Sequence, residues 1–430
     1  MAIKVYKGNI ISSETFDKLR VIENGYIVVE DGFIKEVCQN LKDEYKDVEL
    51  IDYGNKLIVP AFSDLHMHAP QYTQRGIGMD CLLFDWLNNY TFPQEANYKD
   101  PAYAKSVYAR LVREFIRQGS FQLVLYTTIH YEACDILFRM LKEAGLYAYT
   151  GLVNMDMNSP DYYVDETKES LAKTEKFIVE HLEDDKVKPI LTPRFAPTCS
   201  KELMLGLGEL AKKYDVGVQT HLVESRAEAA WARQLYPEYD SDGLIYEACG
   251  LLQGSGPKVF AHVIFPEAQE ERILSQYNGI SVHCPDATSN VTAGIMPVAE
   301  MTKKGLKIAL GSDVGGGHFL GIYRQVARAT QISKMKEFYE EGQERIRLAN
   351  ALYMAWVNGG SIFDKIGKLE EGYRFNALVI DNMLDEEYYT NLEDALERFC
   401  YIGDERNIFA RYLDGKFIDP DEVYERLLKI

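Results

Sequence analysis

Two histidines separated by one residue, His66 and His68, close a long apolar run and are well placed to do chemistry. Alternate residues of a β-strand point to the same face, so a strand ending in His-x-His aims two imidazoles at one point. Neutral imidazole is a common ligand for zinc and similar divalent metals. A single pair arises easily by chance, so a metal site requires further ligand residues at the ends of other strands.

Such residues do end later strand-like segments. His221 lies in the apolar run 216–224, His262 follows the run 259–261, and Asp313 follows the run 308–310. The chain has only eight histidines, and four of them fall at these strand ends together with one aspartate. This clustering argues against chance and predicts a common site.

The segments that carry these residues alternate with helical patterns. Eight apolar segments are expected to be strands, at 57–68, 121–130, 147–156, 188–196, 217–224, 258–265, 279–286 and 306–314. Helical periodicity lies between most of them, at 101–117, 133–143, 166–183, 201–213, 266–276 and 297–304. This order predicts an α/β fold with a (β/α)8 TIM-type barrel, the doubly wound open sheet being the alternative. In such barrels the chemistry lies at the carboxyl ends of the strands.

The two ends of the chain follow a different pattern of short strands and turns. Residues 3–6, 26–30 and 32–37 are expected to be strands, the last two joined by the turn Glu30-Asp31-Gly32. Residues 376–381 and 408–418 have the same character. We therefore expect a small β-sandwich domain formed by both termini, 1–58 plus 366–430, beside a catalytic barrel domain, 59–365.

The composition excludes several classes of protein. Among 430 residues, Lys and Arg number 47 and Asp and Glu 66, a net charge of −19. An acidic surface disfavours nucleic acid and anionic membranes as partners. The sequence shows neither an apolar run of transmembrane length nor a signal peptide, and its seven cysteines are scattered without a Cys-x-x-Cys pair. These features favour a cytoplasmic protein.

Several motifs together resemble the amidohydrolase superfamily and, within it, the guanine deaminase family. They are His66-Met67-His68-Ala69-Pro70-Gln71, Asp85-Trp86-Leu87, Pro193-Arg194-Phe195, His221-Leu222-Val223-Glu224, His283-Cys284-Pro285 and Gly311-Ser312-Asp313. The similarity runs over the whole barrel and reaches the segment 367–381.

The resemblance implies that His66, His68, His221 and Asp313 hold one divalent metal ion, Zn²⁺ as the first choice and Fe²⁺ as the alternative. Three imidazoles and a carboxylate leave a position for water, whose pKa the ion lowers towards about 7. Binuclear members of the superfamily usually carry a bridging lysine on the fourth strand. Here Lys188 stands at the start of that segment, so we expect a single ion.

Three residues are expected to act in catalysis, by the same resemblance. Glu224 would take a proton from the activated water and pass it to a ring nitrogen of the substrate. Asp313 would share in the proton traffic and help ammonia to leave. His262 would orient the attacking water.

Four further residues are expected to bind the substrate ring. Gln71 and Arg194 suit its polar edge, because a carboxamide offers a donor and an acceptor and a guanidinium offers a fork of donors. Phe195 and Trp86, with Leu82, are expected to form apolar walls, although core packing explains Trp86 and Leu82 equally well.

The leading hypothesis is therefore metal-dependent hydrolytic deamination of the purine base guanine to xanthine and ammonia. One alternative keeps the fold and metal but acts on another purine, a pterin, a pyrimidine or a triazine; another hydrolyses a cyclic amide with two metal ions. The remote alternative is a non-catalytic barrel scaffold, which would typically have lost metal ligands. A homodimer is expected by resemblance only.

Overall fold

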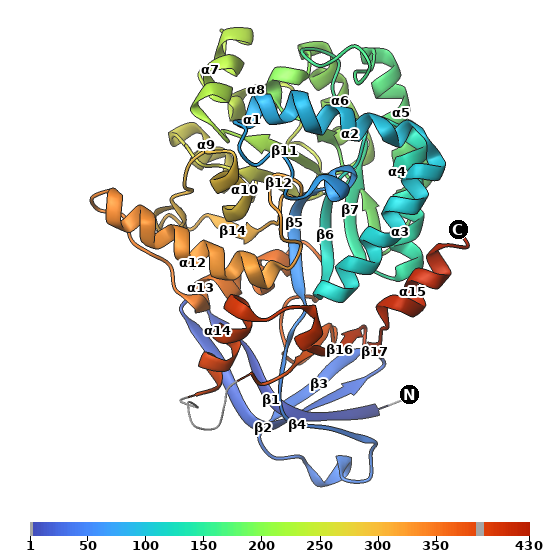
Figure 1. Cartoon of the computed structure of the whole chain (residues 1–430), viewed down its shortest axis with the longest axis vertical. Coiled ribbons are helices and arrows are strands. Elements are labelled where there is room, and N and C mark those ends of the chain that lie inside the picture. Colours follow the sequence, from blue (N-terminus) through green and yellow to red (C-terminus); the bar gives the residue numbers. More distant parts are fainter. Residues whose placement is uncertain (1–2, 384–390) are drawn as a thin grey trace.

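The computed structural model describes residues 3–383 and 391–430. In Figure 1 the chain forms two regions, with parallel strands ringed by helices above and a sheet built from both ends of the chain below. The link between them is short, because β4 (Leu50–Pro60) of the lower sheet is followed after one residue by β5 (Phe62–His68) of the upper region.

Parallel strands of the upper region form two four-stranded sheets. Their orders are β5, β6 (Ser120–Tyr126), β7 (Tyr147–Gly151), β9 (Val187–Pro189), and β11 (Val218–Leu222), β12 (Lys258–His262), β13 (Ile280–His283), β14 (Lys307–Leu310). A parallel bridge between Leu191 and Val218 joins the first sheet to the second. Beyond β14, the backbone N–H of Asp313 donates to the carbonyl of His66 in β5 at 2.8 Å. Eight parallel strands in chain order are consistent with the predicted TIM-type barrel.

Helices follow most of these strands, as predicted. The expected ones are α3 (Pro101–Gln118), α4 (Tyr131–Ala144), α5 (Thr167–His181), α6 (Lys201–Tyr214), α9 (Ala268–Gln276) and α11 (Val298–Lys303). In α3, Asp100 caps the first turn, Pro101 occupies the first helical position, and Gly119 ends the helix with a φ of +77°. No helix in the described ranges is both long and apolar enough to cross a membrane.

The structure adds helices that the sequence patterns did not indicate. They are α1 (Leu83–Trp86), α2 (Phe92–Ala96), α7 (Arg226–Leu235), α8 (Asp242–Ala248), α10 (Pro285–Asn290), α12 (Ile322–Tyr339), α13 (Leu348–Tyr353), α14 (Leu392–Ile402) and α15 (Pro420–Leu427). The C-terminal α15 packs beside α3 (Figure 1). Two short pairing segments, β8 (Val153–Asn154) and β10 (Thr192–Pro193), complete the barrel region.

Both termini contribute to one seven-stranded sheet, as expected from their sequence pattern. Its order is β17 (Lys416–Phe417), β16 (Ile408–Leu413), β15 (Ala377–Ile380), β4, β1 (Ile3–Thr15), β2 (Lys18–Glu30), β3 (Phe33–Cys38). The described strands of this region belong to a single sheet, so the two facing sheets of a sandwich are not confirmed. The predicted domain limits stay a prediction.

The apolar run 57–68, expected to be one barrel strand, is two strands in different sheets. Pro60 ends β4 opposite Ala377, whereas Phe62 begins β5 opposite Ser120. Proline has no amide hydrogen to continue a ladder. Both segments are buried, so hydrophobicity alone does not mark the boundary between them.

Candidate active site

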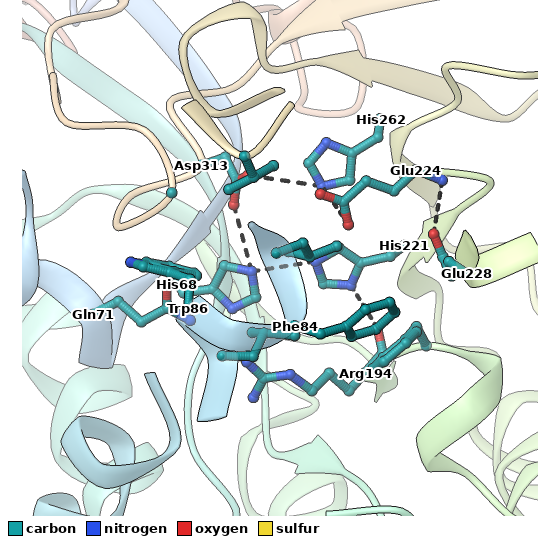
Figure 2. Close-up of a pocket in the computed structure, with 15 residues that line it drawn as sticks. His68, Gln71, Phe84, Trp86, Arg194, His221, Glu224, Glu228, His262 and Asp313 are labelled. Atoms are coloured by element: carbon teal, nitrogen blue, oxygen red, sulfur yellow. Dashed lines mark hydrogen bonds and ion pairs between the residues drawn. The ribbon is translucent and has the colours of Figure 1, made fainter. Parts of the chain in front are cut away.

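A pocket lies at the carboxyl ends of the barrel strands and gathers most of the predicted site residues (Figure 2). Its lining is His68, Gln71, Leu83, Phe84, Trp86, Leu87, Arg194, Phe195, His221, Glu224, Glu228, His262, Val291, Asp313 and Gly316. His66 lies directly behind it, with its Nε2 atom 3.2 Å from Asp313 Oδ1. Leu82 does not line the pocket and is 62% exposed; its neighbour Leu83 lies there instead.

Four imidazoles, including that of His66, and the carboxylate of Asp313 converge at the base of the pocket. His68 Nε2 lies 3.3 Å from His221 Nε2 and 3.5 Å from Asp313 Oδ1. His262 Nε2 lies 3.7 Å from Asp313 Oδ2, on the far side of that carboxylate. Figure 2 shows these side chains pointing toward one another from different strands.

The chemistry of this cluster fits a bound cation. Burial, and then the positive charge of Arg194, lower the pKa of His66 to about 3, and burial also holds the pKa of His68, His221 and His262 well below the usual range. The imidazoles are therefore neutral at physiological pH, with lone pairs free for a metal. His66 Nε2 is buried and makes no hydrogen bond to any described residue. Burial raises the pKa of Asp313 well above its usual range, and a bound cation would favour its charged form.

The backbone around the site fixes which ring nitrogen faces the cluster. His221 Nδ1 lies 2.6 Å from the Arg194 carbonyl oxygen. A carbonyl only accepts, so Nδ1 carries the hydrogen and Nε2 keeps its lone pair toward His68. Asp313 has a φ of +46°, a left-handed conformation that aspartate tolerates better than most residues. Its own N–H is held by the His66 carbonyl.

Glu224 lies just past the end of β11, where the chain turns sharply. Val223 before it has a φ of +43°, a strained value for a β-branched residue. The Glu224 side chain enters the pocket with Oε2 3.6 Å from His262 Nε2. Burial, with a contribution from the charge of Asp313, raises the pKa of Glu224 to about 8. A carboxyl group with a pKa near neutral suits proton transfer.

Glu228 is a pocket residue that the sequence analysis missed. Its Oε2 atom accepts a hydrogen bond from the Glu224 N–H at 2.9 Å, which holds the turn that carries Glu224. With Ser225 it forms the capping box of α7. The Ser-x-x-Glu spacing was a readable signal for that cap, although not for the contact with Glu224.

The opposite wall of the pocket contains Gln71 and Arg194, and both contact a second residue that was missed, Glu95, which is buried and does not line the pocket itself. Arg194 Nη1 lies 2.7 Å from Glu95 Oε2 and Nη2 lies 3.1 Å from Glu95 Oε1. Gln71 Nε2 donates to Glu95 Oε1 at 2.6 Å, and Gln71 Oε1 accepts from the Gly315 N–H at 3.1 Å. Glu95 follows the motif residues 85–87 by eight positions and belongs to no motif we recognised.

Aromatic side chains form the remaining surface. The Trp86 indole donates to the Ile77 carbonyl at 3.1 Å. Phe84 and Phe195 both pack edge-on against Trp231, with ring centroids 5.7 Å and 6.2 Å away. The pocket thus offers flat apolar faces beside one polar edge, a shape that suits a planar heterocycle.

Fold and site together define a class of protein. Residues 57–418 match the amidohydrolase family, and this covers most of the chain. The chain therefore belongs to the amidohydrolase family, whose members are metal-dependent.

Within that family, several relatives with high identity and coverage are guanine deaminases. The guanine deaminase of Dictyostelium discoideum is 33% identical over 97% of this chain and 98% of its own length. That of Escherichia coli is 30% identical over 99% and 98%. The crystal structure of guanine deaminase from C. acetobutylicum with bound guanine in the active site superposes with a TM-score of 0.93, at 42% identity, over 97% of this chain and 100% of that one. At these levels of identity and coverage, the chain is a member of the guanine deaminase branch.

Proposed function

We propose that this protein is a hydrolase that deaminates guanine to xanthine and ammonia. One observation carries the proposal: a pocket with a buried His and Asp cluster on one side holds Gln71 and Arg194 on the other. A guanine ring presents a carbonyl oxygen, N–H donors and ring nitrogen acceptors along its edge. A carboxamide and a guanidinium match those groups.

His66, His68, His221 and Asp313 would hold one divalent ion, Zn²⁺ in our proposal and Fe²⁺ as the alternative. Such an ion lowers the pKa of water and polarises the group under attack. The proposal of a single ion is supported by Lys188, whose side chain is exposed and therefore not available to bridge two metals.

The protons move through the protein's own carboxyl groups. Glu224 takes the first proton of the attacking water and delivers it to the ring nitrogen next to the carbon that bears the amine. The water oxygen bonds to that carbon. Asp313 takes the second proton and delivers it to the amine, so that the C–N bond breaks and neutral ammonia leaves.

His262 is supported as the residue that orients the water. Its Nε2 atom lies 3.6 Å from Glu224 and 3.7 Å from Asp313, between the two groups that exchange protons. Phe195 and Trp86 would flank the ring from the apolar side of the pocket.

Ammonia release by purified, zinc-supplemented protein tests this function. The substrates are guanine, adenine, cytosine, guanosine and a pterin. We expect fast turnover of guanine alone, because the free base fits a small pocket with one polar edge. Faster turnover of another ring would overturn the substrate, and a metal-loaded protein that releases ammonia from none of them would overturn the activity.

Three further proposals concern assembly, location and domain limits; the first rests on the family resemblance, and the other two on the sequence patterns described above. We propose a homodimer, a cytoplasmic location and the domain limits 1–58 plus 366–430 and 59–365. Light scattering on the purified protein tests the first, fractionation of cells the second, and limited proteolysis the third.

A further inference from the structure

Gln71 and Arg194 form one wall of the pocket, which we call the recognition wall. Both contact Glu95, whose carboxylate is fully buried in the short helix α2. Both of its oxygens accept hydrogen bonds, and all three donors come from Arg194 and Gln71. Two of the five guanidinium N–H groups are used in this way, which leaves three for other partners. Glu95 therefore orients both polar side chains that line this wall.

The same helix holds Arg194 from a second direction. The Arg194 guanidinium carbon lies 5.1 Å from the centroid of the Phe92 ring. Phe92 and Glu95 are three residues apart, so they share one helix face. Because Gln71 is also held by the Gly315 N–H, the wall is ordered without any ligand.

The opposite charges of Arg194 and Glu95 cancel. Arg194 is 2% exposed and Glu95 is fully buried, and a buried guanidinium without a counter-charge is strongly unfavourable. The other titratable groups near the pair are four buried tyrosines and one histidine, namely Tyr98, Tyr108, Tyr126, Tyr163 and His130. Burial raises the pKa of the tyrosines well above the usual range and lowers the pKa of His130 to about 4, so all of them stay neutral. Burial raises the pKa of Glu224 and Asp313 on the other side of the pocket, and the positive charge of Arg194 partly offsets this.

We propose that Glu95 is a positioning residue that makes this wall selective for a neutral ring. It holds the guanidinium and the carboxamide in place and cancels the positive charge of Arg194, so the wall offers hydrogen-bond donors without net attraction for anions. This inference rests on the proposed function, in which the substrate is neutral guanine. The product xanthine loses a ring proton more readily than guanine, so a neutral wall also limits retention of the product anion.

The test compares Glu95→Gln with the parent protein. Glutamine keeps the size and one acceptor but leaves the Arg194 charge unpaired. We expect KM for guanine to rise on the order of 10- to 100-fold with metal content unchanged. Inhibition by xanthine should strengthen on the order of tenfold on the alkaline side of neutral, where xanthine is anionic, and little on the acid side.

Arg194→Met is the converse variant. It leaves the Glu95 carboxylate unpaired, so xanthine inhibition should weaken on the alkaline side. Glu44→Gln is the matched control, because it removes one exposed carboxylate far from the pocket and should change neither KM nor xanthine inhibition.

Parent turnover of guanine is measured first, and its absence would count against the proposed function and not against Glu95. If the parent is active but neither variant changes the pH dependence of xanthine inhibition, the charge role of Glu95 is wrong. If Glu95→Gln does not fold, Arg194→Met decides: unchanged alkaline inhibition by xanthine would refute the proposal.

Discussion

The two sides of the pocket are built in opposite ways. On the strand side, neutral imidazoles and carboxylates crowd together, and His66 Nε2 has no hydrogen-bond partner among the described residues. On the helix side, Arg194, Glu95 and Gln71 satisfy one another. The first side is incomplete without a cation, whereas the second is ordered before any ligand arrives. The site thus separates the histidine and aspartate cluster, which needs a cation, from the polar side chains that are already ordered to bind the substrate.

The two sides also touch at two places. The Arg194 carbonyl accepts from His221 Nδ1, while its guanidinium pairs with Glu95. The Gly315 N–H, two residues after Asp313, donates to Gln71 Oε1. A change on one side can therefore reach the other through the backbone of Arg194 or through Gln71. The variants below ask how independent the two sides are, from the largest expected effect to the smallest.

His221→Ala should have the largest effect, because it removes a ring from the cluster and the hydrogen bond to the Arg194 carbonyl. We expect loss of metal and a fall in turnover of at least about 10³-fold. Metal analysis and ammonia release measure both. His181→Ala, in α5 and outside the pocket, is the control and should keep its metal. Full metal content in His221→Ala would remove His221 from the ligand set.

Glu224→Gln should separate metal binding from catalysis. We expect full metal content and a loss of turnover of about 10²- to 10⁴-fold, because the amide cannot accept the proton of the attacking water. Rapid-quench or steady-state ammonia assays with metal analysis on the same sample give the answer. Near-normal turnover would show that another group moves the proton.

Arg194→Lys should damage only the recognition side. Lysine keeps the positive charge but loses the planar fork that meets Glu95 in two places. We expect KM for guanine to rise on the order of tenfold, with metal content unchanged. Steady-state kinetics with metal analysis test this. A loss of metal instead would mean that the two sides are coupled through the Arg194 backbone.

Trp231→Leu should have the smallest effect. Trp231 supports Phe84 and Phe195 from behind and does not line the pocket itself. Loss of the two edge-on aromatic contacts costs about 1 kcal/mol of folding stability each. Because Trp231 does not line the pocket, only part of this loss reaches substrate binding, and KM should rise by less than about tenfold. Measurements of KM and of the unfolding temperature on the same variant distinguish local loosening of Phe84 and Phe195 from a general loss of stability. A large fall in kcat with normal stability would mean that the aromatic wall also places the ring for attack.

Much of the barrel was readable from the sequence. All eight expected strand segments contain a parallel strand, because buried parallel strands are continuous apolar runs. The observed strands are shorter, since the periodic pattern continues into the turns that carry the site; β11 ends at Leu222, before Glu224. The break between β4 and β5 was not readable, because the last four residues of β4 and all of β5 are buried.

The sequence by itself determined the cluster residues, since each of His66, His68, His221, His262 and Asp313 lies at or near the end of a strand, and parallel strands bring those ends to one rim. Only the tertiary structure decided what supports Gln71, Arg194 and Glu224. Glu95 and Glu228 lie on helices whose positions depend on packing between segments far apart in the chain, and Glu95 meets Arg194 across 99 residues. The spacing of residues along a strand predicts which side chains point into the site. A buried ion pair, in contrast, depends on tertiary packing, because packing brings the two residues together and excludes water from both.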